Sequence, residues 1–234
     1  MAALAELVAS IAGPGPLKIP HRDVSHLDAQ FCDAAGRLRV MPCAAYAAVE
    51  PMDLLYWAST RGYYGLPTVE LIHALRTAVA PGRTIEIGAG SGTLGRALGI
   101  PMTDSYVQAA LEYKLLYGML GQQTAPYGAD VRRLEALEAA REYRPTVILA
   151  SWVTQVCKTD TEAHAFAQGV DEEALLALPF LRTYIVLGTT NVHDHKRIRK
   201  QVPAGWRFSE ASLPCLWSRV LDQKTNRIYV WERR

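Results

Sequence analysis

A glycine-rich stretch between residues 84 and 95 carries the residue types with the clearest chemistry. It reads Thr84-Ile-Glu-Ile-Gly-Ala-Gly-Ser-Gly-Thr-Leu-Gly95, and Gly88, Gly90 and Gly92 alternate after an apolar run. Glycines are needed where a backbone turns tightly and where a ligand approaches it closely. A helix that begins after Gly92 directs its free N–H groups and partial positive charge to the same place. The spacing therefore predicts a nucleotide-type binding loop between a strand and a helix.

Two acidic residues indicate what kind of ligand this loop takes. Glu86 stands two residues before Gly88, where a carboxylate repels a pyrophosphate but suits a ligand that carries a positive amine. Asp104 ends the next strand-like run, Ile100 to Asp104, and an acidic side chain there can accept hydrogen bonds from ribose hydroxyls. Because Asp104 follows the loop so closely, the helix between them must be short, and we expect Gly99 to end it.

The run Glu86-Ile-Gly88-Ala-Gly90-Ser-Gly92 resembles the first motif of class I S-adenosylmethionine-dependent methyltransferases, an acidic residue followed by alternating glycines. The resemblance extends over residues 80 to 234. It implies an α/β fold with a doubly wound, Rossmann-like, seven-stranded and mostly parallel sheet whose last strand inserts antiparallel. It also implies S-adenosylmethionine as the cofactor and methyl transfer as the reaction. The residues that it places on the cofactor are Glu86, Gly88, Ala89, Gly90, Gly92, Asp104, Asp130, Ser151 and Trp152.

The resemblance also suggests which part of the cofactor each residue contacts. Glu86 and the glycines would hold the methionine part, and Asp104 the ribose. Asp130, in Gly128-Ala-Asp130-Val, is similar to the family's third acidic position, which contacts the adenine amine. Ser151 and Trp152 follow an apolar run that ends at Ala150, where the family's fourth motif lines both the cofactor and the methyl acceptor.

Other functions remain open at this level. The stretch Gly90-Ser-Gly92-Thr-Leu-Gly95 also fits the NAD-type pattern, but it begins two residues after the strand end instead of directly at it. We therefore favour S-adenosylmethionine over an NAD-dependent oxidoreductase. A non-catalytic module that only binds the cofactor is a further alternative. The acceptor is not encoded by a motif; we favour a small molecule, while RNA or protein is possible.

Histidines and basic residues follow a later strand-like run that ends near Gly188. His193 could contact the acceptor or act as a general base, because imidazole exchanges a proton near neutral pH. The alternative is a solvated loop that leads into a basic helix. The four basic residues between Lys196 and Lys200 could face an acidic substrate or RNA, although a solvated helix face is the simpler interpretation. We predict no metal site, because no further ligands accompany the histidines.

The elements that must position these residues alternate between strand-like and helical patterns, which predicts right-handed βαβ units and a parallel sheet. A terminal antiparallel hairpin is expected from two apolar runs around a polar turn. A helix is expected over Val131–Glu142. The expected strands are Thr84–Ile87, Ile100–Asp104, Pro126–Ala129, Thr146–Ala150 and Thr183–Leu187, with Leu216–Leu221 and Arg227–Trp231 in the hairpin.

Composition sets the outer limits on function. The chain has 234 residues, of which 50% are hydrophobic and 21% charged, with a formal net charge of +2. That balance argues for a folded globular protein, and it predicts no particular charged partner. We expect residues 1–80 to form a mainly helical N-terminal extension or lid that packs on an α/β domain, residues 81–234.

Cysteine spacing and the N-terminus bear on the compartment. The four cysteines lie far apart without a CxxC pair, which is typical of thiols in a reducing environment. The first residues are apolar but lack the basic start of a signal peptide. No apolar run approaches the length of about 20 residues that a membrane helix needs. We therefore expect a cytoplasmic protein with no membrane association.

Overall fold

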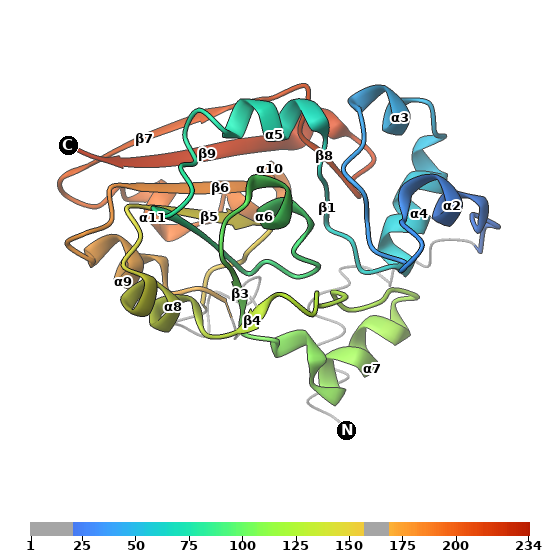
Figure 1. The fold of residues 1–234 in the computed structure, drawn as a ribbon, viewed down its shortest axis with the longest axis horizontal. Coiled ribbons are helices and arrows are strands. Elements are labelled where there is room, and N and C mark those ends of the chain that lie inside the picture. The colour runs from blue at the N-terminus through green and yellow to red at the C-terminus, as the bar shows by residue number, and fades with distance from the viewer. Residues whose placement is uncertain (1–20, 157–168) are drawn as a thin grey trace.

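A seven-stranded sheet forms the centre of the computed structural model, which describes residues 21–156 and 169–234. Its strand order is β4-β3-β2-β5-β6-β9-β7. The first five strands are parallel, and β9, the last in sequence, lies antiparallel between β6 and β7 (Figure 1). This confirms the predicted fold class. The strands are β2 (Thr84–Ile87), β3 (Met102–Asp104), β4 (Arg132–Arg133), β5 (Val147–Ser151), β6 (Thr183–Thr189), β7 (Trp206–Ala211) and β9 (Asn226–Arg233).

Helices cover both faces of this sheet, because its central strands carry apolar side chains on both sides. In β5, Ile148 and Ala150 point into one core and Leu149 into the other, as the two-residue period of a strand requires. Helices α5 (Val69–Leu75) and α6 (Thr93–Leu98) pack on the Leu149 face. The opposite face is covered by α8 (Ala136–Tyr143), α9 (Glu172–Ala177) and α11 (Arg197–Lys200). The short helix α10 (Thr190–His193) follows β6 directly.

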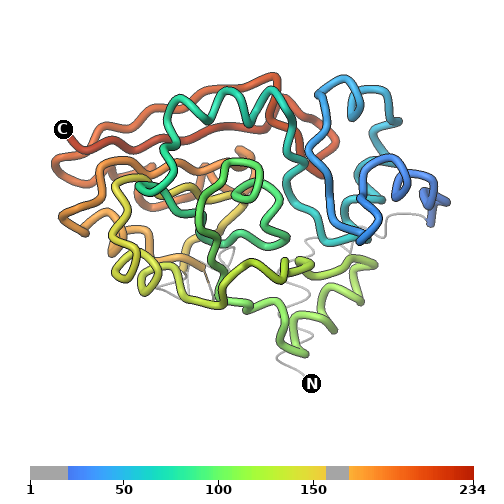
Figure 2. Tube along the Cα trace, in the orientation of Figure 1, coloured from blue at the N-terminus to red at the C-terminus, as the bar shows by residue number. Residues whose placement is uncertain are grey.

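The N-terminal part has a small core of its own and lies at one end of the sheet (Figure 2). It contains α2 (His26–Phe31), α3 (Cys43–Ala47), α4 (Pro51–Thr60) and β1 (Gly65–Leu66). Strand β1 pairs antiparallel with β8 (Trp217–Ser218), so the N-terminal and C-terminal parts of the chain share a second, two-stranded sheet. The boundary at residue 80 stays a prediction, but residues on either side of it pack together.

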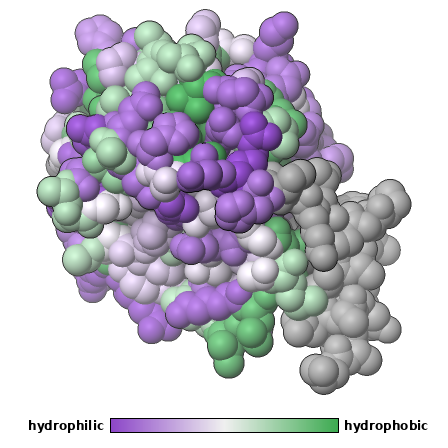
Figure 3. Space-filling model, turned by 90° about the vertical axis from the view of Figure 1, so that its right-hand side faces the viewer, coloured by the Kyte–Doolittle hydropathy of each residue, from purple (hydrophilic) through white to green (hydrophobic). Residues whose placement is uncertain are grey.

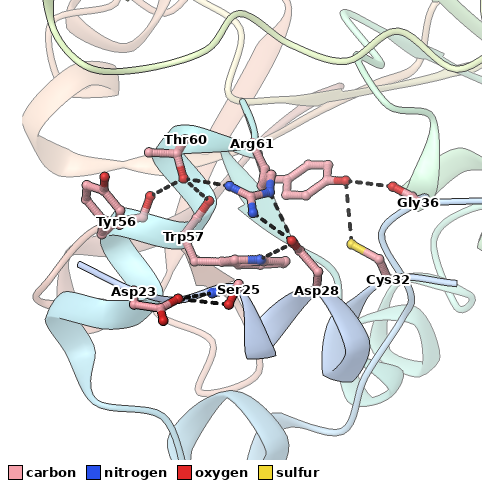
Figure 4. Close-up of polar contacts among 10 residues, drawn as sticks. Asp23, Ser25, Asp28, Cys32, Gly36, Tyr56, Trp57, Thr60 and Arg61 are labelled. Atoms are coloured by element: carbon pink, nitrogen blue, oxygen red, sulfur yellow. Dashed lines mark hydrogen bonds and ion pairs between the residues drawn. The ribbon is translucent and has the colours of Figure 1, made fainter. Parts of the chain in front are cut away.

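A polar network fixes the end of α4, where the chain leaves the N-terminal helices (Figure 4). The carboxylate of Asp28 accepts from the indole N–H of Trp57 at 2.9 Å and from Nη2 of Arg61 at 2.6 Å. The hydroxyl of Tyr63 donates to the carbonyl of Gly36 at 3.3 Å. Arginine holds a carboxylate in a defined plane, so this network sets the direction in which the next residues run.

The predicted third strand and the helix after it lie a few residues too early in the sequence. The strand is β4, Arg132–Arg133, and α8 begins at Ala136. Within the segment that we expected as a strand, Gly128 donates to the carbonyl of Gly90, and just before it Ala125 donates to the side chain of Gln108. Pro126 has no N–H to give to a ladder.

The predicted terminal hairpin also has a different partner. Residues 217–218 pair with β1, whereas β9 pairs with β6 on one edge and β7 on the other. Since both edges of β9 are occupied, Leu216–Leu221 cannot add to it. The turn between them, η2 (Gln223–Thr225), is held by Asn226, whose side chain donates to the carbonyl of Leu216 at 2.9 Å.

One side of the surface combines polar and apolar regions. The face in Figure 3 is largely hydrophilic, with apolar atoms along its lower edge, at the height of α7 (Leu111–Met119) in Figure 1. On that helix Leu111, Leu115 and Met119 are more than half exposed, and their spacing of four places them on one side of it. None of the helices in the described ranges has the length and apolar character needed to cross a bilayer.

Candidate functional site

A cavity of about 560 Å³ lies where β2, β3 and β5 end at their carboxyl sides. This volume falls in the range of small-molecule sites. The chain leaves β2 toward β3 on one side, and β5 lies on the other side, which is the switch point where open α/β sheets bind ligands. The lining combines the glycine loop, residues 151–154 after β5, residues 62–65 of the N-terminal part and Tyr113 and Tyr117 of α7.

The glycine loop adopts a backbone that other residues rarely adopt. Gly88, Gly90 and Gly92 have φ values of +61°, +52° and +71°, in the left-handed region that favours glycine. A Cβ on Gly88 would come within 2.3 Å of a methyl group of Val153, whereas a Cβ on Gly90 would meet only Ala125, at 3.7 Å. Gly88 is therefore needed for packing, and the backbone of Gly90 faces the open cavity, as predicted for a ligand-binding position.

Glu86 is buried at the bottom of this loop. Its side chain lines the cavity, and Oε2 accepts a hydrogen bond from the backbone N–H of Gly95, in the first turn of α6, at 2.8 Å. Burial raises the pKa of Glu86 to about 8. Its other oxygen makes no hydrogen bond to a described residue, so a ligand amine in the cavity would find an acceptor there.

Asp104 connects the end of β3 to the loop. Oδ2 accepts from the N–H of Gly90 and Oδ1 from the N–H of Tyr106, both at 2.9 Å, and the side chain lines the cavity. Burial raises the pKa of Asp104 above its ordinary value. Helix α6 is short and ends at Gly99, whose φ is +70°, which confirms the short connection that this position requires.

The third acidic position differs from the prediction. Asp130 is exposed, lies outside the described cavity lining, and forms a two-pronged ion pair with Arg96, with contacts of 2.6 and 2.8 Å. Glu135 is the acidic residue after β4 that lines the cavity: it lies two residues beyond the strand, and its side chain makes no hydrogen bond or ion pair to a described residue. The sequence signal for Glu135 is its place between a strand and the start of a helix. We missed it because we predicted the strand at Pro126–Ala129 instead of Arg132–Arg133.

Ser151 and Trp152 line the cavity as predicted from their place after β5, and so does Ala89. Trp152 has a φ of +63°, uncommon for a residue with a side chain, and its N–H donates to the carbonyl of Leu187 at 2.8 Å. A Cβ on Gly65 would lie 2.3 Å from the indole Nε1. The indole therefore packs against the backbone of Gly65, which has no side chain, and both residues line the cavity.

His193 lies neither in the cavity lining nor on a solvated loop. The structure therefore contradicts both the predicted role at the acceptor and the alternative of a solvated loop. Its side chain is buried in α10, and Nδ1 accepts from the N–H of Thr189 at 3.0 Å. The ring meets Trp152 edge-to-face at 5.9 Å. Burial, with the nearby charge of Lys196, lowers the pKa of His193 to about 3. The imidazole is therefore neutral near pH 7, and its ring packs against the indole of Trp152.

Lys196 is likewise buried instead of solvated. Its ammonium pairs with Glu172 at 2.6 Å, with both side chains 2% exposed, and it also donates to the carbonyl of Val153 at 3.0 Å. The hydroxyl of Tyr184 donates to the same oxygen of Glu172 at 2.7 Å. The basic run therefore includes a residue that holds the segment after β5 in place beneath the cavity.

Comparison with known proteins gives matches among solved structures alone; no family model and no curated protein matches. One similar structure is the SAM-dependent methyltransferase from Agrobacterium tumefaciens, with a TM-score of 0.34 and 14% identity over 70% of this chain and 60% of that one. Another is the delta-N METTL16 MTase domain, with a TM-score of 0.41 and 14% identity over 90% and 97%. This chain thus spans 60% of the length of the first. By its strand order and its inserted last strand, the chain has the Rossmann-like fold of class I S-adenosylmethionine-dependent methyltransferases.

Proposed function

We propose that this protein transfers the methyl group of S-adenosylmethionine to a small molecule bound in the same cavity. The observation that carries this proposal is that the glycine loop, Glu86 and Asp104 line one cavity at the switch point of the sheet. The open space beside Gly90 is where a cofactor can lie against the backbone without meeting a side chain.

The charges of the lining favour this cofactor over a dinucleotide. Three carboxylates, on Glu86, Asp104 and Glu135, line the cavity, and the described lining residues include no lysine, arginine or histidine. Such groups ionise readily beside a ligand that carries an ammonium and a sulfonium, whereas a pyrophosphate would find no cation in the described lining and is repelled by each ionised carboxylate. The alternative of an NAD-dependent oxidoreductase therefore has weaker support.

The residues present fit the parts of the cofactor. Glu86 offers an acceptor for the ammonium, Asp104 for the ribose hydroxyls, and Glu135 for the adenine amine. When bound, S-adenosylmethionine supplies an electrophilic methyl group that a nucleophile can take. The chain's own contribution is to hold the acceptor in line and to exclude water, which lowers the barrier without a dedicated catalytic base.

A small acceptor suits the walls of the cavity. Residues 62–65 and the tyrosines of α7 enclose the side opposite the glycine loop, and aromatic walls of this kind fit small planar molecules. RNA would need basic side chains along its path, and the described lining provides none.

Ligand identification in the purified protein tests the proposal. We expect mass spectrometry to detect S-adenosylmethionine or S-adenosylhomocysteine, and calorimetry to show binding of both but not of NADH. Asp104→Ala should weaken binding by roughly ten- to a hundredfold, because a charged acceptor is lost. Ser91→Ala serves as the matched control. Bound NAD would overturn the proposal, whereas cofactor binding without turnover on any acceptor would leave a binding module.

A further inference from the structure

A hydrogen-bonded group of polar side chains from three distant segments lines the cavity. The hydroxyls of Tyr64 and Tyr117 bond to each other, and Nε2 of Gln108 lies 3.1 Å from the hydroxyl of Tyr64. Oε1 of Gln108 accepts from the N–H of Ala125 at 2.9 Å. All three polar side chains belong to the cavity lining.

One phenol proton of this group has only a long hydrogen bond. Ala125 fixes the amide of Gln108 so that its NH₂ group faces the hydroxyl of Tyr64. The two phenols hold two protons and share one oxygen–oxygen contact, so the second proton is left with the Gln108 oxygen, at 3.4 Å. Burial raises the pKa of Tyr117, so it keeps its proton at neutral pH.

A cation without an ion-pair partner among the described residues stacks on the ring of Tyr64. The guanidinium of Arg219 is 3.8 Å from the centre of the Tyr64 ring, and its backbone N–H donates to the carbonyl of Tyr64 at 3.1 Å. Its Nη1 is buried and makes no hydrogen bond to any described residue. No described carboxylate lies within ion-pair distance of it. A buried donor without an acceptor carries a desolvation cost, which an anion nearby would reduce.

Trp152 adds a further donor on the same side. Its indole Nε1 lies over Gly65, the residue next to Tyr64, and makes no hydrogen bond to a described residue. The lining carboxylates, Glu86, Asp104 and Glu135, lie at or after the ends of β2, β3 and β4, whereas Tyr64, Tyr117 and Arg219 come from the N-terminal part, α7 and the β8 segment. The cavity therefore combines acidic groups from the sheet edge with hydroxyl groups that have a cation beside them.

We propose that the methyl acceptor carries an ionised oxygen group, a carboxylate or a phenolate, which binds at the paired hydroxyls of Tyr64 and Tyr117 in the field of Arg219. Its role as acceptor rests on the proposed function; the anion site itself does not. An oxygen anion is a stronger acceptor for that phenol proton than the Gln108 oxygen, and it would lie in the field of Arg219, for which the described residues provide no ion-pair partner. A cationic amine would instead meet hydroxyl donors and a like charge.

Binding of small probes to protein saturated with S-adenosylhomocysteine tests this inference. The probes are benzoate and 4-nitrophenolate as the two anion types, with benzamide and benzylamine as the neutral and cationic analogues. We expect calorimetry to show at least tenfold tighter binding of one anion than of both analogues. Arg219→Gln should reduce that preference to less than threefold, Arg219→Lys should keep part of it, and Tyr117→Phe should weaken anion binding severalfold. Arg207→Gln, which removes an exposed arginine paired with Glu232, is the matched control.

Several results would overturn the inference. These are equal binding of benzoate and benzamide, an unchanged preference in a folded Arg219→Gln variant, no saturable binding of either anion, or binding of an RNA oligonucleotide in place of the small anions. The cofactor titration separates this failure from failure of the proposed function. If S-adenosylhomocysteine binds and the anion preference is absent, the inference fails alone. If it does not bind but an Arg219-dependent preference persists, the proposed cofactor is wrong and the anion site stands.

Discussion

Glu86 should release a proton when the cofactor binds near neutral pH. With a pKa of about 8, its carboxyl is about 90% protonated at pH 7 in the free protein. An ammonium group bound beside it favours the ionised form, so close to 0.9 proton leaves per site. The α-amino group of the cofactor, with a pKa of about 7.7–8.0, takes up roughly 0.1–0.2 proton at the same pH. The net release is therefore more than half a proton at pH 7 and decreases as the pH rises toward 8.

Calorimetry in several buffers at one pH measures this number directly, because the observed enthalpy varies with the buffer's ionisation enthalpy in proportion to the protons released. The same number is the slope of log affinity against pH, so affinity should rise severalfold per pH unit around pH 7. In the free protein the sign is opposite: the raised pKa gives stability that is present below the ordinary carboxyl pKa and is lost as the pH rises through about 8.

Two controls assign the proton to Glu86. Glu86→Gln should abolish most of the release, and any remainder belongs to Asp104, whose pKa is also raised. The ligand 5′-methylthioadenosine lacks the ammonium and should release no proton from the wild type. Tight binding of S-adenosylmethionine with a buffer-independent enthalpy at pH 7 would refute the reasoning, because Glu86 would then keep its protonation state when the site is filled.

Three further predictions follow from the geometry. Glu135→Ala should weaken cofactor binding severalfold whereas Asp130→Ala should not, and calorimetry showing the reverse order would restore Asp130 to the site. Gly90→Val should abolish the thermal shift that saturating S-adenosylmethionine gives, and a variant that melts normally with a full shift would remove the loop from the site. Lys196→Met should lower the free energy of unfolding by about 3–5 kcal/mol, because Glu172 is left buried and unpaired. Adding Glu172→Gln to this variant should recover more than half of the lost free energy. A loss below about 1 kcal/mol for Lys196→Met in urea titrations would contradict this prediction.

The cofactor half of the site could be predicted from the sequence because its signals are local. A buried parallel strand reads as an apolar run, and the positive φ values of the loop demand the glycines that the sequence shows. Glu86 and Asp104 lie at the ends of consecutive strands, and the carboxyl ends of parallel strands meet at one edge of the sheet. The expectation for Glu86, Gly90 and Asp104 needed no knowledge of distant contacts.

The buried charges could not be predicted in this way. Lys196 stands in a basic run, and its partner Glu172 lies 24 residues earlier in the sequence. A lysine reads as solvent-exposed unless a partner for it is known. His193 has the same difficulty: the packing of its ring against Trp152 follows from the neighbouring β5 and β6, and not from its own loop.

The third acidic residue of the candidate site shows how a small error in strand position changes which side chain is expected to meet the ligand. Placing a strand over residues 126–129 puts Asp130 at its carboxyl end, and the observed strand, Arg132–Arg133, puts Glu135 there instead. Backbone hydrogen bonds explain why the strand forms at the later position. Gly128 donates to Gly90, which ties the first segment to the loop and leaves the next residues to pair with β3.

The acceptor half differs from the cofactor half because it is built by tertiary contacts. Tyr64 and Tyr117 are 53 residues apart, and Arg219 comes from the segment that pairs with β1 near the other end of the chain. A strand, a loop and a helix start can form the cofactor site within about twenty residues, so its chemistry is legible in one stretch of sequence. A site assembled from three distant segments has no such signature, and related folds can exchange these segments without disturbing the loop. If the proposed acceptor site is correct, substitutions where the N-terminal part, α7 and the β8 segment meet should change the acceptor while leaving cofactor affinity in place.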